Sequence, residues 1–273
     1  MQAMTASEIN RSFYDALWAD TYLIPPERFN TWPLVRELIV AGSDARRLEI
    51  GPGLRPRLPI AGTVFVEISR AALGRLAEKG GMATHASAES LPFPDGAFGL
   101  VMAMDIIEHL EDDQPVFREL ARVLEPGGMM VMSSPLHPDC WTTFDEVVGH
   151  VRRYEPVDLV ARLDRHGLGL QRSAIYGMQP RSKTLSRMGA WFLTRQRERA
   201  MYWYNRFFMP MALRFEKPLR LMPGMIDARR VDEVLLVCRK RPEATAARAS
   251  CAPPGPGDRT GRLESSVPPS PGA

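Results

Sequence analysis

The chain has 273 residues, of which 45% are hydrophobic and 25% are charged. This composition is typical of globular proteins, and it excludes a collagen-like, disulfide-stapled or wholly disordered chain. The net charge of +3 is unevenly distributed, because residues 1–179 carry 17 basic and 24 acidic side chains whereas residues 180–230 carry 12 basic and 3 acidic ones.

Targeting signals and cysteine patterns add further exclusions. No apolar run reaches the roughly 20 residues that cross a bilayer, and the N-terminal residues lack the basic start and apolar block of a signal peptide. The three cysteines, Cys140, Cys238 and Cys251, are far apart and form no CxxC pair. We therefore expect a cytoplasmic protein with reduced thiols.

Two helical stretches, Ala6–Ala19 and Pro26–Val40, precede the first predicted strand. Short aliphatic runs then alternate with helical patterns, which is typical of an α/β fold with a mostly parallel sheet and crossover helices. The predicted strands are Arg47–Ile50, Thr63–Glu67, Met82–Ala86, Phe98–Asp105, Met129–Ser134, Leu168–Tyr176 and Val231–Arg239. The predicted helices between them are Arg70–Lys79, Asp113–Leu124 and Pro156–His166.

A glycine-rich turn follows the first predicted strand in the run LEIGPG at 48–53. Glycine allows a sharp turn and lets a ligand approach the backbone closely. The second predicted strand ends in Glu67, where a carboxylate can accept both hydroxyls of a ribose. Together the two features predict a nucleoside-binding site at the carboxyl edge of the sheet. The third glycine of a dinucleotide fingerprint is missing, which disfavours a pyrophosphate cofactor.

Five ordered motifs resemble the class I S-adenosylmethionine-dependent methyltransferases, in the broad group of small-molecule enzymes that includes the ubiquinone and menaquinone ones. The motifs are LEIGPG at 48–53, FVEIS at 65–69, SAESLPFPDGAFGLV at 87–101, DIIEHLED at 105–112 and LARVLEPGGMMVMSSP at 120–135. The resemblance covers about residues 45–176. It implies a Rossmann-like seven-stranded sheet with a final antiparallel strand and S-adenosylmethionine as cofactor.

The resemblance also implies which residues line the cofactor site. They are Glu49, Gly51, Pro52, Gly53, Glu67, Ile68, Ser87, Ala88 and Asp105. The glycines would face the amino-acid part of the cofactor, Glu67 the ribose, Ser87 and Ala88 the adenine, and Asp105 the methionine end. Glu49 could instead hold turn amides, and Asp105 could cap the following turn.

The chain departs from the family pattern in its first crossover. Arg55 stands where a third small residue is common, and Pro56 and Pro59 predict a short or irregular connection to the second strand. Ser87 stands where the family usually has an aspartate for the adenine amino group, so backbone contacts would have to serve there.

Three histidines are candidate general bases, because imidazole titrates near neutral pH: His109, His137 and His150. For His109 the favoured alternative is a packing element behind the site, because such a pair just beyond a strand more often has that role. In the GHxRRY run, Arg153 and Tyr154 either orient a substrate or tie a loop onto the sheet. No HExxH, HxH or carboxylate cluster is present, so no metal is expected.

The predicted organisation has five parts. Residues 1–44 form a helical cap, 45–179 the cofactor-binding core, 180–230 a basic aromatic helical insertion, 231–241 the final strand and 242–273 a disordered tail. The tail contains seven prolines, four glycines and no aromatic residue. Such a segment cannot bury enough apolar surface to offset its ordering entropy.

The insertion at 180–230 interleaves aromatic residues with arginines and leaves several interpretations open. It could pack as a plain helical subdomain, close over an apolar substrate as a lid, or lie on an anionic membrane. Nucleic acid is the least favoured partner, because no recognised module accompanies the aromatics. The oligomeric state is not predicted.

The sequence thus predicts an S-adenosylmethionine-dependent methyltransferase that acts on a small, partly apolar molecule. The alternative is a non-catalytic adenosine-binding or scaffold protein on the same fold, because a fold does not fix function. An NAD-dependent oxidoreductase is the enzymatic rival.

Overall fold

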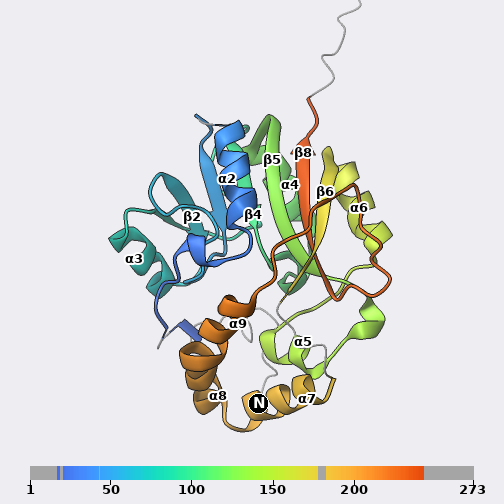
Figure 1. Ribbon diagram of the computed structural model, residues 1–273. Coiled ribbons are helices and arrows are strands. Elements are labelled where there is room, and N and C mark those ends of the chain that lie inside the picture. The colour runs from blue at the N-terminus through green and yellow to red at the C-terminus, as the bar shows by residue number, and fades with distance from the viewer. Residues whose placement is uncertain (1–16, 19–20, 43, 178–182, 243–273) are drawn as a thin grey trace, which may run out of the picture. The chain divides into compact units, whose positions relative to one another are not determined.

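An eight-stranded sheet forms the centre of the computed structural model, which describes residues 17–18, 21–42, 44–177 and 183–242 (Figure 1). The strand order is β3-β2-β1-β4-β5-β8-β6-β7. The pairings among β1 to β5 are parallel, whereas β8 runs antiparallel to both β5 and β6. The strands are β1 (Arg47–Ile50), β2 (Thr63–Glu67), β3 (Met82–His85), β4 (Phe98–Ala103), β5 (Leu124–Pro135), β6 (Leu168–Tyr176), β7 (Met222–Pro223) and β8 (Glu233–Lys240).

Helices cover both faces of this sheet, and a further group lies beyond one of its ends (Figure 1). The α-helices are α2 (Trp32–Ala41), α3 (Arg70–Glu78), α4 (Gln114–Val123), α5 (Thr143–Val148), α6 (Pro156–Arg165), α7 (Lys183–Arg195), α8 (Arg197–Trp203) and α9 (Met209–Phe215). Short helical turns are η1 (Pro26–Arg28), η2 (Ile107–His109), η3 (Pro138–Cys140) and η4 (Tyr204–Phe208).

Alternation along the strands divides the core into two layers. On β4, Val101 packs in the cluster that contains α4 and α6, whereas its neighbour Met102 packs in the cluster that contains α2. Successive side chains of a strand point to opposite faces, so every central strand must be apolar on both sides. This explains why β4 is buried along its whole length.

The mostly parallel, Rossmann-like sheet predicted from the sequence is confirmed. The predicted seven strands become eight, because the two-residue strand β7 pairs with β6 at the sheet edge. A strand of two residues is too short to leave an alternation signal. The antiparallel last strand is also confirmed, although it begins at Glu233 rather than Val231.

Two local predictions differ from the structure. The stretch Pro26–Val40 is not one helix, because η1 ends at Arg28 and α2 begins at Trp32, with a proline in the first turn of each. Proline suits a helix start but interrupts a helix interior. In addition, α5 was not predicted from the sequence; it is a six-residue helix that begins with a capping box at Thr142.

The connection from β1 to β2 contains no helix, and all of residues 51–62 are described. The two prolines in this stretch predicted such an irregular connection. Here the loop folds back on the end of β1, which places its backbone amides at the carboxyl edge of the sheet.

Several predictions fall partly or wholly outside the described residues: most of the first helical stretch, part of the predicted cap and the tail from residue 243 onward. The division into five parts therefore stays a prediction. Within the described ranges, no helix is both long and apolar enough to span a membrane. The cytoplasmic location stays a prediction.

Candidate cofactor and catalytic site

A cavity of about 260 Å³ lies at the carboxyl ends of β1, β2 and β4. All nine residues expected at the cofactor site line it, from Glu49 to Asp105. Of the three candidate histidines, His109 lines the cavity, whereas His137 and His150 do not. Trp18 and Arg55 line it as well, and sequence analysis gave neither a role in the site. Folding thus brings the dispersed motif residues to one place.

Glu67, at the end of β2, points toward the glycine turn. Its Oε2 accepts a hydrogen bond from the Gly53 amide at 2.9 Å, and its Oε1 accepts from the amides of Ile68 at 2.8 Å and Ser69 at 3.0 Å. The side chain is buried. Backbone N–H groups are strong partners for a carboxylate, so Glu67 is held in one orientation at the rim of the cavity.

Only glycine fits at the two glycine positions of the turn, both because of the backbone conformation and because neighbouring side chains leave no space for a Cβ. Gly51 has φ +63° and Gly53 has φ +52°, in the left-handed region that side chains other than glycine rarely adopt. A Cβ on Gly51 would clash with the Ile106 side chain, and one on Gly53 would clash with the Trp18 ring. Trp18 therefore covers the turn at close range.

Arg55, which departs from the family pattern, has a structural explanation. Its guanidinium lies 5.1 Å from the centre of the Trp18 ring and 5.2 Å from that of Tyr204. Cation–π contacts of this kind are attractive at such distances. Arg55 thereby links the glycine turn to Trp18 and to η4. Sequence analysis could not predict this role, because the two aromatic residues are far from Arg55 in the sequence and form no motif with it.

Glu49 takes the structural alternative that the sequence left open. Its two oxygens accept hydrogen bonds from the amides of Arg57 and Leu58, both at 2.8 Å. Burial raises the pKa of Glu49 to about 7, although these two hydrogen bonds oppose the change. Glu49 lines the cavity and also fixes the loop after the glycine turn.

Asp105 follows β4 with φ +53°, an unusual conformation for a residue with a side chain. Its amide donates to Ser133 Oγ at 3.0 Å, and the Ser133 hydroxyl donates back to Asp105 Oδ1. Burial and the neighbouring Asp105 raise the pKa of Glu233 well above its usual value. Two carboxyl groups therefore meet next to the cavity, and no sequence pattern indicated this pair.

His109 lies on η2 beside the cavity, and its Nδ1 is 3.2 Å from the Gly149 carbonyl. Burial and the neighbouring His150 lower the pKa of His109 to about 3, although the contact with Gly149 opposes the change. The ring is thus neutral near pH 7, but it accepts a proton weakly. General-base catalysis by His109 stays a prediction, and this pKa argues against it.

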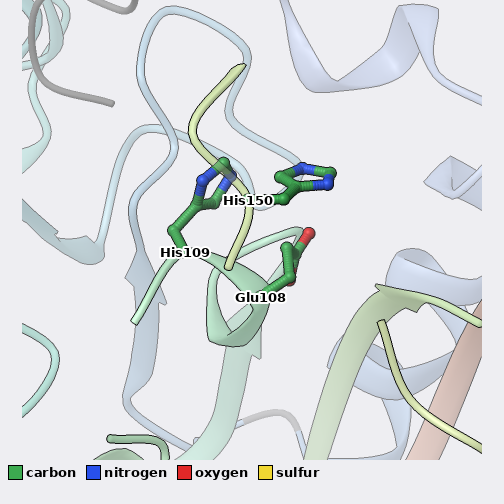
Figure 2. Close-up of side chains that lie close together, drawn as sticks. All are labelled: Glu108, His109 and His150. Atoms are coloured by element: carbon green, nitrogen blue, oxygen red, sulfur yellow. The ribbon is translucent and has the colours of Figure 1, made fainter. Parts of the chain in front are cut away.

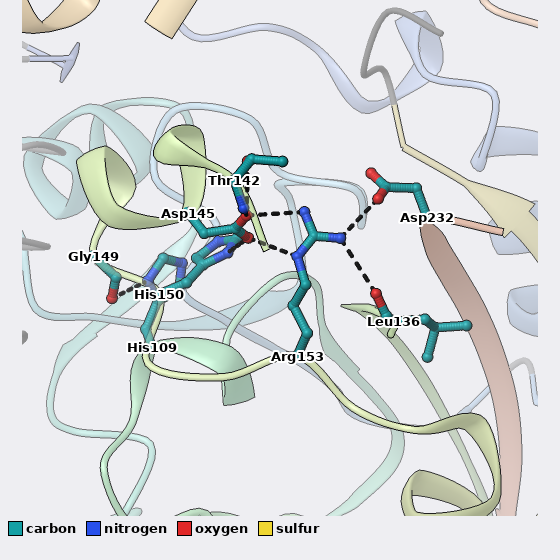
Figure 3. A network of polar contacts seen from close by, with 8 residues as sticks. All are labelled: His109, Leu136, Thr142, Asp145, Gly149, His150, Arg153 and Asp232. Carbon is teal, nitrogen blue, oxygen red and sulfur yellow. Dashed lines mark hydrogen bonds and ion pairs between the residues drawn. The ribbon is translucent and has the colours of Figure 1, made fainter. Parts of the chain in front are cut away.

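His150 belongs to a buried polar network that Figure 3 shows. Its Nδ1 donates to Asp145 Oδ1 at 2.8 Å, and Arg153 donates to both oxygens of the same carboxylate at 2.9 and 3.0 Å. Arg153 also bonds Asp232 at 2.7 Å and the Leu136 carbonyl at 3.2 Å. Burial tends to raise the pKa of Asp145, but the hydrogen bonds from His150 and Arg153 outweigh it and hold the pKa below its usual value.

Tyr154, in the same run, and His137 also make contacts that connect loops to one another. The Tyr154 hydroxyl donates to Asp113 at 2.7 Å. His137 has φ +61°, and its Nε2 lies 2.7 Å from the Ala228 carbonyl. The geometry therefore favours the structural interpretation of Arg153 and Tyr154, and it places His137 away from the cavity.

A comparison with known families matches residues 49–132 to a family described as "Methyltransferase domain". The matched region begins at Glu49 and includes the glycine turn, Glu67 and Asp105, so it spans β1 to most of β5.

Curated relatives are similar over limited stretches. An ajmaline N-methyltransferase of Rauvolfia serpentina is 43% identical over 49 residues, which are 18% of this chain and 17% of that one. An uncharacterized methyltransferase of Mycobacterium sp. (strain JLS) is 29% identical over 126 residues, 44% of this chain and 49% of that one. The chain thus spans about half the length of these relatives or less.

Solved structures share the fold at low identity. The [4+2]-cyclase SpnF has a TM-score of 0.55 at 18% identity, with 89% of this chain and 98% of that chain covered. An S-adenosylmethionine-dependent methyltransferase of Thermotoga maritima has a TM-score of 0.51 at 13% identity, with 84% and 100% covered. These likenesses establish the fold, and a cyclase among them illustrates that the fold alone does not determine the reaction. The narrower resemblance to the ubiquinone and menaquinone enzymes stays a prediction.

Proposed function

Since the chain carries a methyltransferase domain of the class I family, we propose that it transfers the methyl group of S-adenosylmethionine to a small, partly apolar acceptor. One observation carries this proposal: the cavity at the carboxyl ends of β1, β2 and β4 is lined by all nine residues expected to hold that cofactor. At the two left-handed glycines a Cβ would clash with Ile106 and Trp18, so only glycine fits there, and Glu67 presents a carboxylate at the rim.

The proposed mechanism depends on positioning the acceptor rather than on strong acid–base catalysis. The bound sulfonium supplies an already reactive methyl group. The chain has to hold the acceptor in line with the bond that breaks, at about 3 Å, and to exclude water. Trp18 covers the glycine turn, and the carboxylates of Glu67 and Asp105 favour a cationic ligand over a neutral product.

Contacts made by the basic aromatic insertion support the proposal that part of it covers this cavity as a lid. Asn205 on η4 donates from Nδ2 to the Leu17 carbonyl at 2.9 Å, and Arg55 contacts Asn205 Oδ1 at 3.4 Å. Met201 is buried in the same apolar cluster as Trp18 and Leu54. We propose that η4 and α8 close the acceptor side of the site and exclude water from it.

Exposed side chains of the insertion support a second proposal, peripheral contact with an anionic membrane. Large apolar side chains between α7 and α9 are exposed: Met188, Trp191, Tyr202, Trp203, Phe207, Phe208, Met211 and Phe215. Arg199, Arg206 and Arg214 of the same segment are also exposed. Exposed aromatics together with basic residues suit the headgroup region of anionic bilayers.

Vesicle cosedimentation tests the membrane proposal. We expect the full chain to sediment with vesicles that contain phosphatidylserine and to stay in the supernatant with phosphatidylcholine alone. Replacing Trp191 and Phe215 by serine should reduce sedimentation, whereas Val157→Ser on α6, which is 78% exposed, should not. Equal recovery with both kinds of vesicle, or none with either, would contradict the proposal.

Metabolite profiling with a trideuteromethyl donor tests methyl transfer itself. Cells that express the protein should contain at least one labelled metabolite that cells without the gene lack. Cells that express Gly53→Ala should lose that signal. A protein that binds S-adenosylmethionine but yields no labelled product in cells or extracts would support the scaffold alternative instead.

A further inference from the structure

We propose that Glu108, His109 and His150 form a binding site for a divalent transition-metal cation of the zinc class, beside the cofactor cavity. The sequence predicted no metal, because these residues lie in two separate segments and match no ligand motif. The fold brings one ligand atom from each residue within 4.8 Å of the others. Figure 2 shows the three side chains converging, two from η2 and one from the loop after α5.

Glu108 is the observation that points to a ligand. Its side chain is 1% exposed, and neither carboxylate oxygen has a hydrogen-bond partner among the described residues. Buried polar atoms are nearly always paired, and an unpaired buried carboxyl group is costly. A cation between Glu108 and the two histidines would supply the partner that this group needs.

Both histidines are already oriented as metal ligands usually are. His109 Nδ1 faces the Gly149 carbonyl at 3.2 Å, and His150 Nδ1 faces the Asp145 carboxylate at 2.8 Å. Because these oxygens only accept, Nδ1 carries the hydrogen in each ring and Nε2 carries the lone pair. Metal-binding histidines typically donate their other N–H to a carbonyl or a carboxylate in this way.

The surrounding backbone and ion pairs hold the three residues in place. The Val151 amide donates to the Glu108 carbonyl at 2.8 Å, which fastens the loop that carries His150 to η2. Arg153 holds Asp145 with two hydrogen bonds, as Figure 3 shows. The site is thus supported from both segments before any cation binds.

The donor set selects the kind of cation. Two imidazole nitrogens and one carboxylate oxygen are the protein ligands of one group of catalytic zinc sites, which keep a further position open. Ligand atoms around zinc lie about 3.4 Å apart, since each is about 2.1 Å from the metal. A modest rotation of the side chains from their present positions would therefore bring the three ligand atoms to the spacing that zinc needs. Hard cations such as calcium prefer all-oxygen ligands and fit less well.

If the proposed methyl transfer holds, this position also indicates the class of acceptor. His109 lines the cofactor cavity, so an open coordination position there could take an acceptor hydroxyl. Coordination would favour loss of the hydroxyl proton to water. The oxygen lone pair would then form the new O–CH3 bond while the S–CH3 electron pair returns to sulfur, which becomes a neutral thioether.

The test uses the full chain without a polyhistidine tag, stripped with a chelator and titrated calorimetrically with zinc. We expect one equivalent to bind, and Glu108→Gln and His150→Gln to weaken binding at least about tenfold. Two control variants, His85→Gln on β3 and Cys140→Ser at an exposed thiol, should bind as the wild type does. Visible absorption of the cobalt-loaded wild type should be lost in Glu108→Gln.

A thermal-shift readout covers the case in which a variant folds poorly. Zinc should raise the melting temperature of the wild type, because a ligand that binds only the folded state stabilises it, and it should not raise that of Glu108→Gln. The proposal would be overturned if the wild type took up no zinc, or if Glu108→Gln and His150→Gln took up as much zinc as the wild type does. S-adenosylmethionine binding to the metal-free protein is measured separately, so failure of the metal site and failure of the proposed function are distinguishable.

Discussion

The two sides of the cofactor cavity are built in different ways. On one side, β1, β2 and the loop between them contribute the glycine turn, Glu49 and Glu67, whose carboxylates accept from backbone amides of the same stretch of chain. On the other side, His109 lies on η2, and its Nδ1 contacts the Gly149 carbonyl of a separate segment, in which buried ion pairs surround Asp145. The first side depends on local backbone geometry, and the second depends on side chains that meet only in the folded protein.

The comparison predicts that the second side is the more fragile. Arg153→Met keeps most of the side-chain volume but leaves the buried Asp145 carboxylate without its main cationic partner. We expect the free energy of unfolding, measured in urea, to fall by about 3–5 kcal/mol. Arg229→Met is the matched control, since its ion pair with Asp227 is exposed, and it should leave stability unchanged. Equal stability of Arg153→Met and wild type would contradict the assigned role of Asp145.

On the first side, Gly53→Ala separates crowding from backbone strain. Alanine at φ +52° is strained by about 1–2 kcal/mol, and its Cβ would also clash with Trp18. Gly127→Ala is the matched control, because Gly127 has φ +81° and open space around its Cβ position. We expect Gly53→Ala to lose more unfolding free energy than Gly127→Ala and also to lose S-adenosylmethionine binding. Equal losses of stability in the two variants would show that Trp18 does not press on the turn.

Glu67→Gln sharpens the comparison by changing charge while preserving shape. Hydrogen bonds to charged groups contribute about 1.5–3 kcal/mol. The dissociation constant for S-adenosylmethionine should therefore rise by about 10- to 100-fold in a calorimetric titration. Glu78→Gln, on the exposed face of α3, should bind as the wild type does. An unchanged affinity in Glu67→Gln would remove the carboxylate from the proposed site.

The last prediction concerns the pH dependence of stability that Glu49 causes. Burial raises its pKa from 4.5 to about 7, so the folded protein keeps a proton that the unfolded chain releases above pH 4.5. Its contribution to stability is full below pH 4.5 and is lost as the pH rises through 7, at no more than about 1.4 kcal/mol per pH unit. The difference in unfolding free energy between wild type and Glu49→Gln should therefore decrease from pH 5 to pH 7. An unchanged difference would contradict the raised pKa.

The same contrast explains what could be predicted from the sequence. The glycine turn and Glu67 follow predicted strands directly, so strand ends alone bring them to one edge of a parallel sheet. The contact of His109 with Gly149 depends on how the loop after α5 meets η2, and that of Glu233 with Asp105 depends on how β8 packs, which no local pattern encodes. Trp18 is an intermediate case. Its place in a predicted cap indicates that it covers part of the sheet edge, but the sequence does not indicate that it covers Gly53.

The most direct test of the central claim is a calorimetric titration of the full-length wild-type protein with S-adenosylmethionine, with NADH as the comparison ligand. We predict one S-adenosylmethionine site with micromolar affinity and no binding of NADH. A folded protein that binds NADH, or neither ligand, would contradict the assignment of the cavity.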